Sequence, residues 1–235
     1  MSRSTLDSHI LSLPRRAVLR PIDSTSATVD DFNSSDSPLA GIKVLPLKRA
    51  VDIILASIGL LFLLPFTAFI GSAICIDSPG PIFYGQERIG LGGRRFTLWK
   101  FRSMRVNAEN GKAVWAQRND SRVTRVGRIL RKTHVDEFPQ FWNVLKGEMS
   151  VVGPRPERPE FAAELENVIP FYRVRHTVKP GMAGWALVCQ GYGGSDTDAL
   201  LKLEYDLYYI KHQSSFFDVV ILLKTGIDMI AFRGR

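Results

Sequence analysis

The sequence has few residues that could build a metal-binding or disulfide scaffold. Only two of its 235 residues are cysteines, Cys75 and Cys189, and they lie far apart in different sequence contexts. No CxxC pair and no cluster of cysteine with histidine is present, which argues against a structural zinc site and a disulfide framework. We therefore expect both thiols to be reduced, in a reducing compartment.

Charge is absent from the stretch 53–76. A straight helix of this length would reach roughly 36 Å, enough to cross a bilayer core of about 30 Å. The stretch lies too far from the N-terminus for an ordinary cleaved signal peptide. Pro65 falls in its middle, and a proline removes a backbone hydrogen bond and kinks a helix, so each half reaches only about half of the bilayer core.

Three interpretations of this segment are open: a kinked spanning helix, a re-entrant helix that dips into one leaflet and returns, and a buried core helix. Basic residues flank both of its ends, and positively charged flanks favour the cytoplasmic side, so the pattern is satisfied at both ends only if both face the cytoplasm. We favour the re-entrant helix, with its break at Pro65. The flanking basic residues are Lys43, Lys48 and Arg49 before it and Arg88, Arg94, Arg95 and Lys100 after it.

A dinucleotide-binding fingerprint is also missing. The glycines of Gly90-Leu-Gly-Gly stand between two predicted strands, 82–84 and 95–101, and lack the strand, helix and distal acid that the fingerprint requires. The pattern predicts a β-hairpin instead. No internal repeat is evident.

The remaining patterns predict an α/β fold rich in helix. We divide the chain into a disordered tail at 1–42, a membrane segment at 43–77 and a small cytosolic domain at 78–235. Helices are expected at 122–132, 157–168 and 198–212, and a loop entering a short strand at 179–185. The apolar stretch 216–232 is interrupted by Lys224 and Asp228, which fits a helix in the membrane interface or a core helix.

The formal net charge of +8 and the pI near 9.7 favour an anionic partner. Nucleic acid, an anionic bilayer surface and phosphorylated substrates all satisfy this condition. Charge by itself does not choose among them.

Two adjacent carboxylates, Asp136 and Glu137, lie in a strongly basic neighbourhood. They precede a predicted helix whose end suits Gly147. Its apolar residues at helical spacing are Phe138, Phe141, Trp142 and Leu145. We expect the pair at or beside the N-cap, where the helix dipole keeps carboxylates ionised and a phosphate or metal-bound phosphate could approach. A simple helix cap is the alternative interpretation.

Several motifs between Lys48 and the C-terminus occur in the order of a known family. Together they resemble the monotopic phosphoglycosyl transferases, the bacterial sugar transferase family. The motifs are Lys48-Arg-Ala-Val-Asp52, Asp77-Ser-Pro-Gly-Pro-Ile-Phe-Tyr84, Gln86-Glu-Arg88-Ile-Gly90, Lys100-Phe-Arg102-Ser-Met104, Arg131 before Asp136-Glu137, Asn143 to Ser150, Val152-Gly-Pro-Arg155-Pro156, Lys179-Pro-Gly-Met-Ala-Gly-Trp185 and Tyr205-Asp-Leu-Tyr-Tyr-Ile-Lys-His212.

The resemblance implies transfer of a sugar phosphate from a UDP-sugar to a polyprenyl phosphate such as undecaprenyl phosphate, with release of UMP. It implies Mg²⁺ as cofactor and a covalent intermediate. Asp136 would be the nucleophile on the β-phosphorus and a ligand of the metal. Glu137 would assist the second step by taking a proton from the lipid phosphate or by orienting it.

The same resemblance extends to further site residues. Arg155 stands between two prolines and offers a rigid planar fork for phosphate oxygens. The other candidates for phosphate contacts are Arg131, Arg158 and Lys179, and those for the lipid phosphate or membrane interface are Lys48 and Arg49.

The resemblance also implies partners and a location. The partners are a UDP-sugar, undecaprenyl phosphate and inner-membrane lipid, without nucleic acid; a homo-oligomer is left open. The location is the bacterial inner membrane, with the catalytic domain facing the cytoplasm. The sugar and the glycan are not specified, and a UDP-hexose such as glucose or galactose is the leading expectation.

Two other functions remain as alternatives. A conventional membrane glycosyltransferase would release UDP and would use the acidic pair only to hold metal. A non-catalytic basic module would bind nucleic acid or anionic lipid in a salt-sensitive way, without turnover of nucleotide.

Overall fold

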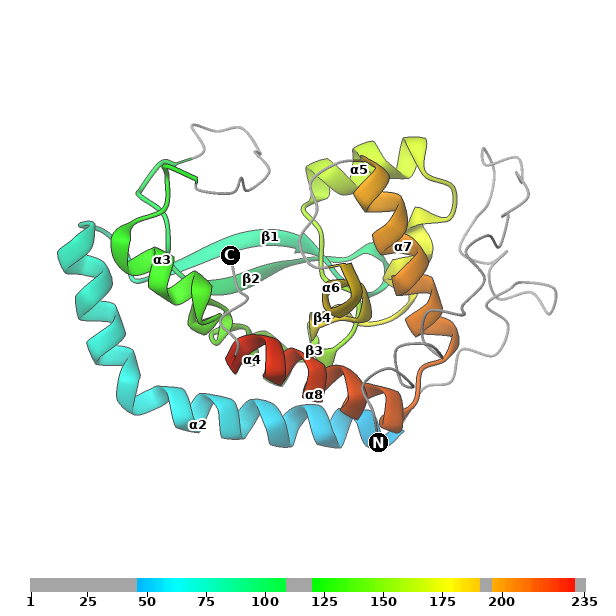
Figure 1. Cartoon of the computed structure of the whole chain (residues 1–235), viewed down its shortest axis with the longest axis horizontal. Coiled ribbons are helices and arrows are strands. Elements are labelled where there is room, and N and C mark those ends of the chain that lie inside the picture. Colours follow the sequence, from blue (N-terminus) through cyan, green and yellow to red (C-terminus); the bar gives the residue numbers. More distant parts are fainter. Residues whose placement is uncertain (1–45, 109–119, 191–195, 231–235) are drawn as a thin grey trace, which may run out of the picture.

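The computed structural model describes residues 46–108, 120–190 and 196–230. The predicted disordered tail at 1–42 and the first residues of the predicted membrane segment lie outside these ranges. The described part is dominated by helices around two small sheets (Figure 1), so the prediction of a helix-rich α/β fold is confirmed.

The apolar segment forms one long helix, α2 (Pro46–Asp77), with Pro65 inside it. The helix axis bends partway along its length (Figure 1). One face packs against the rest of the chain through Ala56, Leu63 and Ile74, while the other exposes large apolar side chains. Only 11% of its most apolar window is buried, so the alternative of a buried core helix is wrong. By length and composition, α2 could cross a membrane.

The predicted hairpin is present. Strand β1 (Phe83–Ile89) pairs antiparallel with β2 (Arg95–Phe101), and a short 3₁₀ turn at Leu91–Gly93 joins them. Gly92 and Gly93 adopt positive φ in this turn, which a side chain would disfavour. Since side chains alternate along a strand, one face of the hairpin turns toward helix α4 (Gln140–Lys146).

A second sheet consists of two short parallel strands, β3 (Ser150–Val152) and β4 (Gly181–Ala183). The chain between them forms helix α5 (Pro159–Val168) and the 3₁₀ segment η4 (Tyr172–Thr177). The strand expected within 179–185 and the helix expected at 157–168 are therefore confirmed, with small shifts of their ends.

Helix α3 (Arg125–Lys132) begins three residues later than predicted. Thr124 caps it by accepting from the Gly127 amide, and Val123 forms a β-bridge with Met104 instead of helix. Ile129 is exposed, although its spacing from Val126 and Leu130 predicts a shared apolar face. The buried face is completed by Gly127, whose missing side chain leaves room for Ser103.

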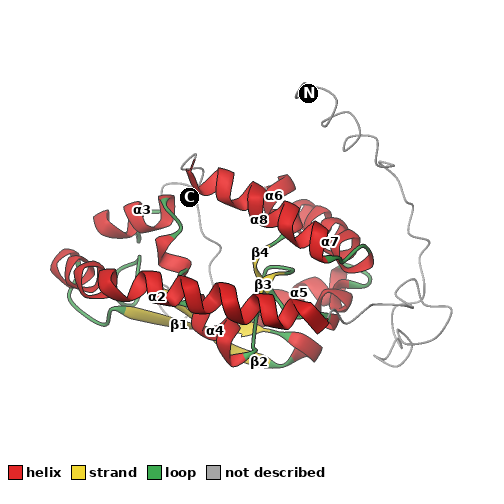
Figure 2. Ribbon diagram, turned by 90° about the horizontal axis from the view of Figure 1, so that it is seen from below, coloured by secondary structure: helices red, strands yellow, loops and turns green. Residues whose placement is uncertain are grey.

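Three helices complete the described chain: α6 (Trp185–Gln190), α7 (Asp196–Lys211) and α8 (Ser215–Ile230). Seen from below, α2 and α8 lie on either side of the small parallel sheet (Figure 2). Exposed apolar residues form a stripe along the outer face of α8, at Phe216, Val219, Leu223 and Ile227, while Ile221 on its inner face is fully buried. This pattern matches the interface alternative for the segment.

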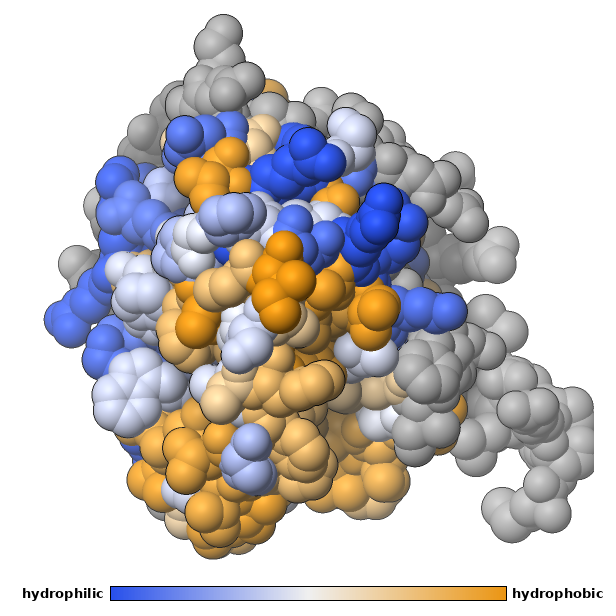
Figure 3. Space-filling model, turned by 90° about the vertical axis from the view of Figure 1, so that its left-hand side faces the viewer, coloured by the Kyte–Doolittle hydropathy of each residue, from blue (hydrophilic) through white to orange (hydrophobic). Residues whose placement is uncertain are grey.

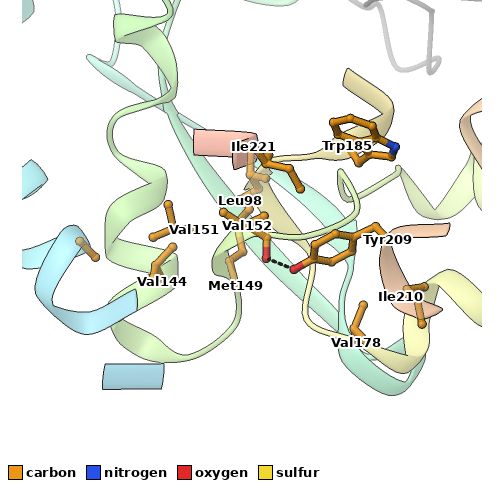
Figure 4. Packing of buried hydrophobic residues seen from close by; sticks show 12 residues of the cluster. Leu98, Val144, Met149, Val151, Val152, Val178, Trp185, Tyr209, Ile210 and Ile221 are labelled. Atoms are coloured by element: carbon orange, nitrogen blue, oxygen red, sulfur yellow. Dashed lines mark hydrogen bonds between the residues drawn. The ribbon is translucent and has the colours of Figure 1, made fainter. Parts of the chain in front are cut away.

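The main core lies where α4, α7 and α8 meet around β3. Val144, Met149 and Ile221 are among its fully buried side chains (Figure 4). Tyr209 of α7 reaches into it and donates its hydroxyl hydrogen to the Val152 carbonyl at 3.3 Å. This core fixes the end of β3, from which the Arg155 segment departs.

Candidate active site

The acidic pair lies in a 3₁₀ turn, η3 (Val135–Glu137), one turn before α4. The predicted position at the N-cap is therefore wrong: Pro139 precedes the first residue of α4 and has no backbone N–H to offer. The end of the helix is as predicted, because Gly147 adopts the left-handed conformation there. His134 also has positive φ, and this turns the chain sharply before the two carboxylates.

Glu137 is clamped between two cations from different elements. Arg155 donates from both terminal nitrogens to its carboxylate, and Lys100 of β2 donates to it at 2.8 Å. This bidentate contact uses the planar fork of the arginine. The two ion pairs hold the pKa of Glu137 well below its usual range, despite burial.

Asp136 behaves in the opposite way. Its side chain is almost fully buried, and no hydrogen bond to its carboxylate occurs among the described residues. Burial, followed by the negative charge of Glu137, raises its pKa to about 6, against the opposing effect of Lys100 and Arg131. The expected stabilisation of the ionised carboxylate by the helix dipole is therefore not found at Asp136, whose pKa moves in the opposite direction. The carboxylate is still mostly ionised at neutral pH, and no described residue donates a hydrogen bond to it.

The cations around the pair crowd one another. The pKa of Lys100 is lowered by burial and by Arg155, while Glu137 opposes this shift. Arg131 donates from Nε to the Ser103 hydroxyl at 2.8 Å. This hydrogen bond fixes the Arg131 side chain beside Asp136. A substrate phosphate is suited to such a place, because the three cations Lys100, Arg131 and Arg155 outnumber the two carboxylates.

The site can hold one Mg²⁺ only with help from a substrate. Among residues 46–108, 120–190 and 196–230, no group of three potential ligands occurs. Asp136 is a carboxylate without a partner, whereas Glu137 is already occupied by Lys100 and Arg155. Because Mg²⁺ commonly binds one or two carboxylates together with substrate phosphates, the donor set fits a metal held by Asp136 and a diphosphate.

Of the predicted phosphate contacts, Arg131 and Arg155 lie at the acidic pair. Arg158 lies at the start of α5, where it is 3.5 Å from Glu160 and faces the ring of Phe161.

Lys179 lies at the other end of α4, close to Gly147 and Arg49. Its pKa is lowered by burial and by the charge of Arg49. Since η3 precedes α4 and Gly147 follows it, the helix separates Lys179 from the acidic pair. A role for Lys179 in phosphate binding stays a prediction.

The two basic residues at the start of α2 contact the protein itself. Lys48 forms an ion pair with Asp218 of α8 at 2.6 Å. Arg49 donates to the carbonyls of Val144 and Leu145 at the C-terminal end of α4, at 2.6 and 2.8 Å. Both therefore fasten α2, and their contact with a lipid phosphate stays a prediction.

Sequence reasoning missed two residues of the site, Lys100 and Arg88. Both belong to motifs noted above, but their function depends on the hairpin register. Tyr84 pairs with Lys100, so Tyr84, Gln86 and Arg88 share its face. Arg88 donates to the Gln86 side chain and to the Pro156 carbonyl, which places it behind the Arg155 segment. The alternation of residues along the two strands was the available signal.

Comparisons with known proteins agree on one family. The family model described as bacterial sugar transferase matches residues 43–232. A UDP-N-acetylgalactosamine-undecaprenyl-phosphate N-acetylgalactosaminephosphotransferase of Aeromonas hydrophila is 47% identical over 76% of this chain and 42% of its own length. A UDP-glucose:undecaprenyl-phosphate glucose-1-phosphate transferase of Escherichia coli (strain K12) is 47% identical over 81% of this chain and 41% of its own length.

A shorter relative matches along nearly its whole length. The exopolysaccharide production protein PSS of Rhizobium leguminosarum bv. phaseoli is 41% identical over 81% of this chain and 98% of its own length. The chain thus spans about two fifths of the two longer relatives and almost all of this one.

Proposed function

Because the chain belongs to the bacterial sugar transferase family, we propose that it transfers a sugar 1-phosphate from a UDP-sugar to undecaprenyl phosphate and releases UMP. Two of the relatives are named as transferases that act on a UDP-sugar and undecaprenyl phosphate, and the third is named for exopolysaccharide production. The reaction would start the assembly of an exopolysaccharide or a related glycan.

The observation that carries the proposal is the state of Asp136. It is a buried carboxylate, without a hydrogen-bond partner in the described chain, next to a fully paired Glu137 and several cations. A carboxylate that serves only to cap a helix would accept hydrogen bonds from the helix amides. An unpaired anion beside excess cations is instead suited to attack an electrophile that brings its own negative charge.

The chemistry takes place in two displacements. An oxygen of Asp136 attacks the β-phosphorus of the UDP-sugar, the bond from that phosphorus to the bridging oxygen breaks, and UMP leaves with the electron pair. A phosphate oxygen of the lipid then attacks the same phosphorus and releases the carboxylate. Each step is a phosphoryl transfer in which positioning and charge neutralisation lower the barrier. Arg131 and Arg155 would supply the positive charge from the protein.

Glu137 is suited to orient the reacting groups. Its ion pairs with Lys100 and Arg155 lower its affinity for a proton, so it is a weak base in this arrangement. Of the two roles expected for it, holding both cations toward the phosphates fits better than taking a proton from the lipid phosphate.

A Mg²⁺ ion, held by Asp136 and the diphosphate, would neutralise phosphate charge and make UMP a better leaving group. This fits the unpaired carboxylate described above.

The contacts of α2 favour a re-entrant helix. At its first turns, Asp52 accepts from the Ser150 hydroxyl and the Val151 amide, both at 2.9 Å. At its end, Asp77 accepts from the Val126 amide at 2.8 Å. The same catalytic body therefore holds both ends of the helix. A kinked spanning helix would still place its two ends on opposite sides of the bilayer, where one body cannot hold both.

This arrangement would bring the two substrates together. A domain fixed at the cytoplasmic face of the inner membrane meets a soluble nucleotide sugar from one side and a lipid phosphate from the other. The apolar outer faces of α2 and α8 would lie in the bilayer and its interface.

The products test the proposal. Membrane-embedded protein is incubated with Mg²⁺, undecaprenyl phosphate and a panel of UDP-sugars, and UMP and UDP are measured separately. The proposal predicts lipid-dependent UMP with at least one donor. Lipid-dependent UDP would instead identify a conventional glycosyltransferase and refute the nucleophilic role of Asp136.

A further inference from the structure

The segment that carries Arg155 is held along its whole backbone. The four successive carbonyls from Pro154 to Glu157 each accept a hydrogen bond from a different residue, at 2.8, 2.9, 3.2 and 3.0 Å. The donors are Gly181 N, Arg175 Nη2, Arg88 Nη1 and Ile89 N, in that order. The carbonyl of Arg155 itself is the one bound by Arg175.

Arg175 reaches this carbonyl from a buried position in η4. Its side chain is only 4% exposed. One terminal nitrogen donates to the Tyr172 hydroxyl at 2.6 Å, and the other donates to both the Asp206 carboxylate, at 2.8 Å, and the Arg155 carbonyl, at 2.9 Å. The guanidinium thus joins the active-site segment to helix α7, which carries Asp206.

A second buried carboxylate completes the cluster. Glu157 lies 3.7 Å from Arg175, 3.7 Å from Lys202 of α7 and 4.0 Å from Arg88 of β1. Glu157 follows Arg155 by two residues, so the cluster binds both a main-chain carbonyl and a side chain of this segment. It lies behind the segment, whereas the guanidinium of Arg155 points to Glu137.

Stability is a weak reason for such a cluster. Burying several charges costs free energy, and well-packed apolar residues often stabilise a core as well or better. A guanidinium can instead bind a carboxylate and a carbonyl in one fixed plane, which a lysine or an apolar side chain cannot do. The cluster therefore has a geometric use: it sets the position of the Arg155 main chain.

We propose that Arg175, anchored by Asp206, is a positioning residue that holds the Arg155 main chain so that the Arg155 guanidinium meets Glu137 and the transferring phosphate. The inference rests on the proposed function and adds a positioning pair to it. Displacing a positioned group by about 1 Å can cost on the order of a hundredfold in rate, so the tether matters for turnover.

Two conservative variants test the tether. Arg175→Lys keeps a positive charge but loses the fork, and Asp206→Asn keeps the shape but weakens the anchor. We expect each to lower the rate of UMP release about ten- to a hundredfold, as loss of an orienting contact commonly does. The control is Arg173→Lys, in the same segment, whose exposed side chain pairs with Glu166 and should leave the rate unchanged.

A double-mutant cycle separates positioning from a general loss of structure. Arg155→Lys removes the group that Arg175 is proposed to position. In this background Arg175→Lys should lower the rate of UMP release by less than about threefold further, because the guanidinium that Arg175 positions is already absent. If Arg175→Lys lowers the rate by the same factor in both backgrounds, or not at all in the wild-type background, the inference is overturned.

The readouts distinguish this inference from the proposed function. The wild-type protein is assayed first, and the absence of UMP release with every donor would overturn both. Wild-type turnover together with full activity of both variants would overturn the positioning role only. Asp206→Asn keeps the test decisive if Arg175→Lys does not fold, which circular dichroism of each purified variant would show.

Discussion

At the scale of single residues, the site depends on the different surroundings of two adjacent carboxylates. Glu137 is paired with Lys100 and Arg155, which lower its pKa, whereas burial and the charge of Glu137 raise the pKa of Asp136 to about 6. Two neighbouring carboxylates whose pKa values are shifted in opposite directions commonly have separate roles. In the proposed reaction Asp136 is the nucleophile and Glu137 holds the two cations in place.

The raised pKa of Asp136 predicts an acid limb in the first half-reaction. Only the ionised carboxylate attacks phosphorus, so kcat/KM for UMP release from the donor should fall as the pH drops through about 6. The measurement is the first turnover without lipid, because the lipid phosphate then cannot contribute its own titration. A rate that stays level down to about pH 4.5 would contradict the assignment.

The same shift predicts that Asp136→Asn stabilises the fold at neutral pH. A carboxyl whose pKa is higher in the folded state than its ordinary value of 3.8 binds protons more tightly there. The free energy of unfolding therefore falls as the pH rises from about 4 to about 6, and the loss remains above that. Asparagine avoids this loss, which we expect to be on the order of 1–3 kcal/mol.

Thermal unfolding without substrate, followed at two pH values, checks this result. The melting temperature of Asp136→Asn should exceed that of the wild type at pH 7.5, and the difference should shrink near pH 4. An Asn variant that melts below the wild type at pH 7.5 would show that the carboxylate stabilises the fold, as a helix cap would.

The sequence located part of this site and not the rest. The sequence indicated the acidic pair because Asp136 and Glu137 are adjacent. It indicated Arg155 because this residue stands between two prolines. Lys100 was recognisable only as part of a motif, since its contact with Glu137 depends on the register of the hairpin and on its packing against α4. Local pattern carries no information on such distant contacts.

At the scale of elements, most helices, the hairpin and the strand after Lys179 could be predicted, whereas β3 and the starts of two helices could not. The acidic pair was expected to begin α4, whereas a 3₁₀ turn precedes it because Pro139 offers no amide hydrogen to a cap. Helix α3 starts late because Val123 pairs with Met104. A missing donor in the first case and a tertiary pairing in the second override the helical periodicity.

The close contact between the two parallel strands predicts that Gly181 does not tolerate a larger side chain. A side chain at Gly181 would place its Cβ 2.0 Å from the backbone nitrogen of Gly153, so Gly181→Ala must push the strands apart. We expect a loss of about 1–3 kcal/mol in the free energy of unfolding. UMP release should fall as well, because the Gly181 amide binds the Pro154 carbonyl beside Arg155.

Gly226 of α8 supplies the matched control. Apart from the helix's own backbone and the two chain neighbours, no atom of the described residues lies within 4 Å of the Cβ that an alanine would add there. Gly226→Ala should therefore leave activity unchanged and stabilise the helix by up to about 1 kcal/mol. Equal melting temperatures of the Gly181→Ala protein and the wild type would contradict the close packing of β3 and β4.

At the scale of the whole molecule, apolar and polar surfaces are separated. Viewed from the end that carries the bend of α2, the lower half of the surface is largely apolar and the upper half largely polar (Figure 3). The outer faces of α2 and α8 supply large exposed apolar residues. An apolar face that carries many large exposed side chains is typical of contact with a membrane or another apolar partner.

The proposed re-entrant topology predicts that both ends of α2 face the cytoplasm. Leu47 and Ile76 are exposed near its two ends. Single Leu47→Cys and Ile76→Cys variants are made in a background where Cys75 and Cys189 are replaced by serine. A membrane-impermeant maleimide added to intact spheroplasts should label neither variant, whereas the same reagent added to inverted vesicles should label both.

The controls for topology are simple. A permeant maleimide should label both variants in spheroplasts and so show that the thiols are reactive. If the impermeant reagent labels one of the two variants in intact spheroplasts, α2 spans the membrane, and the re-entrant helix is wrong.

The most direct test of the central claim is isotope exchange without lipid. If Asp136 carries the phosphosugar, wild-type protein with Mg²⁺ should transfer label from UMP into the UDP-sugar in the absence of undecaprenyl phosphate, because the first step then runs in both directions. The Asp136→Asn protein, folded and membrane-bound, should show no exchange. Exchange by that variant at a rate near that of the wild type would contradict the account.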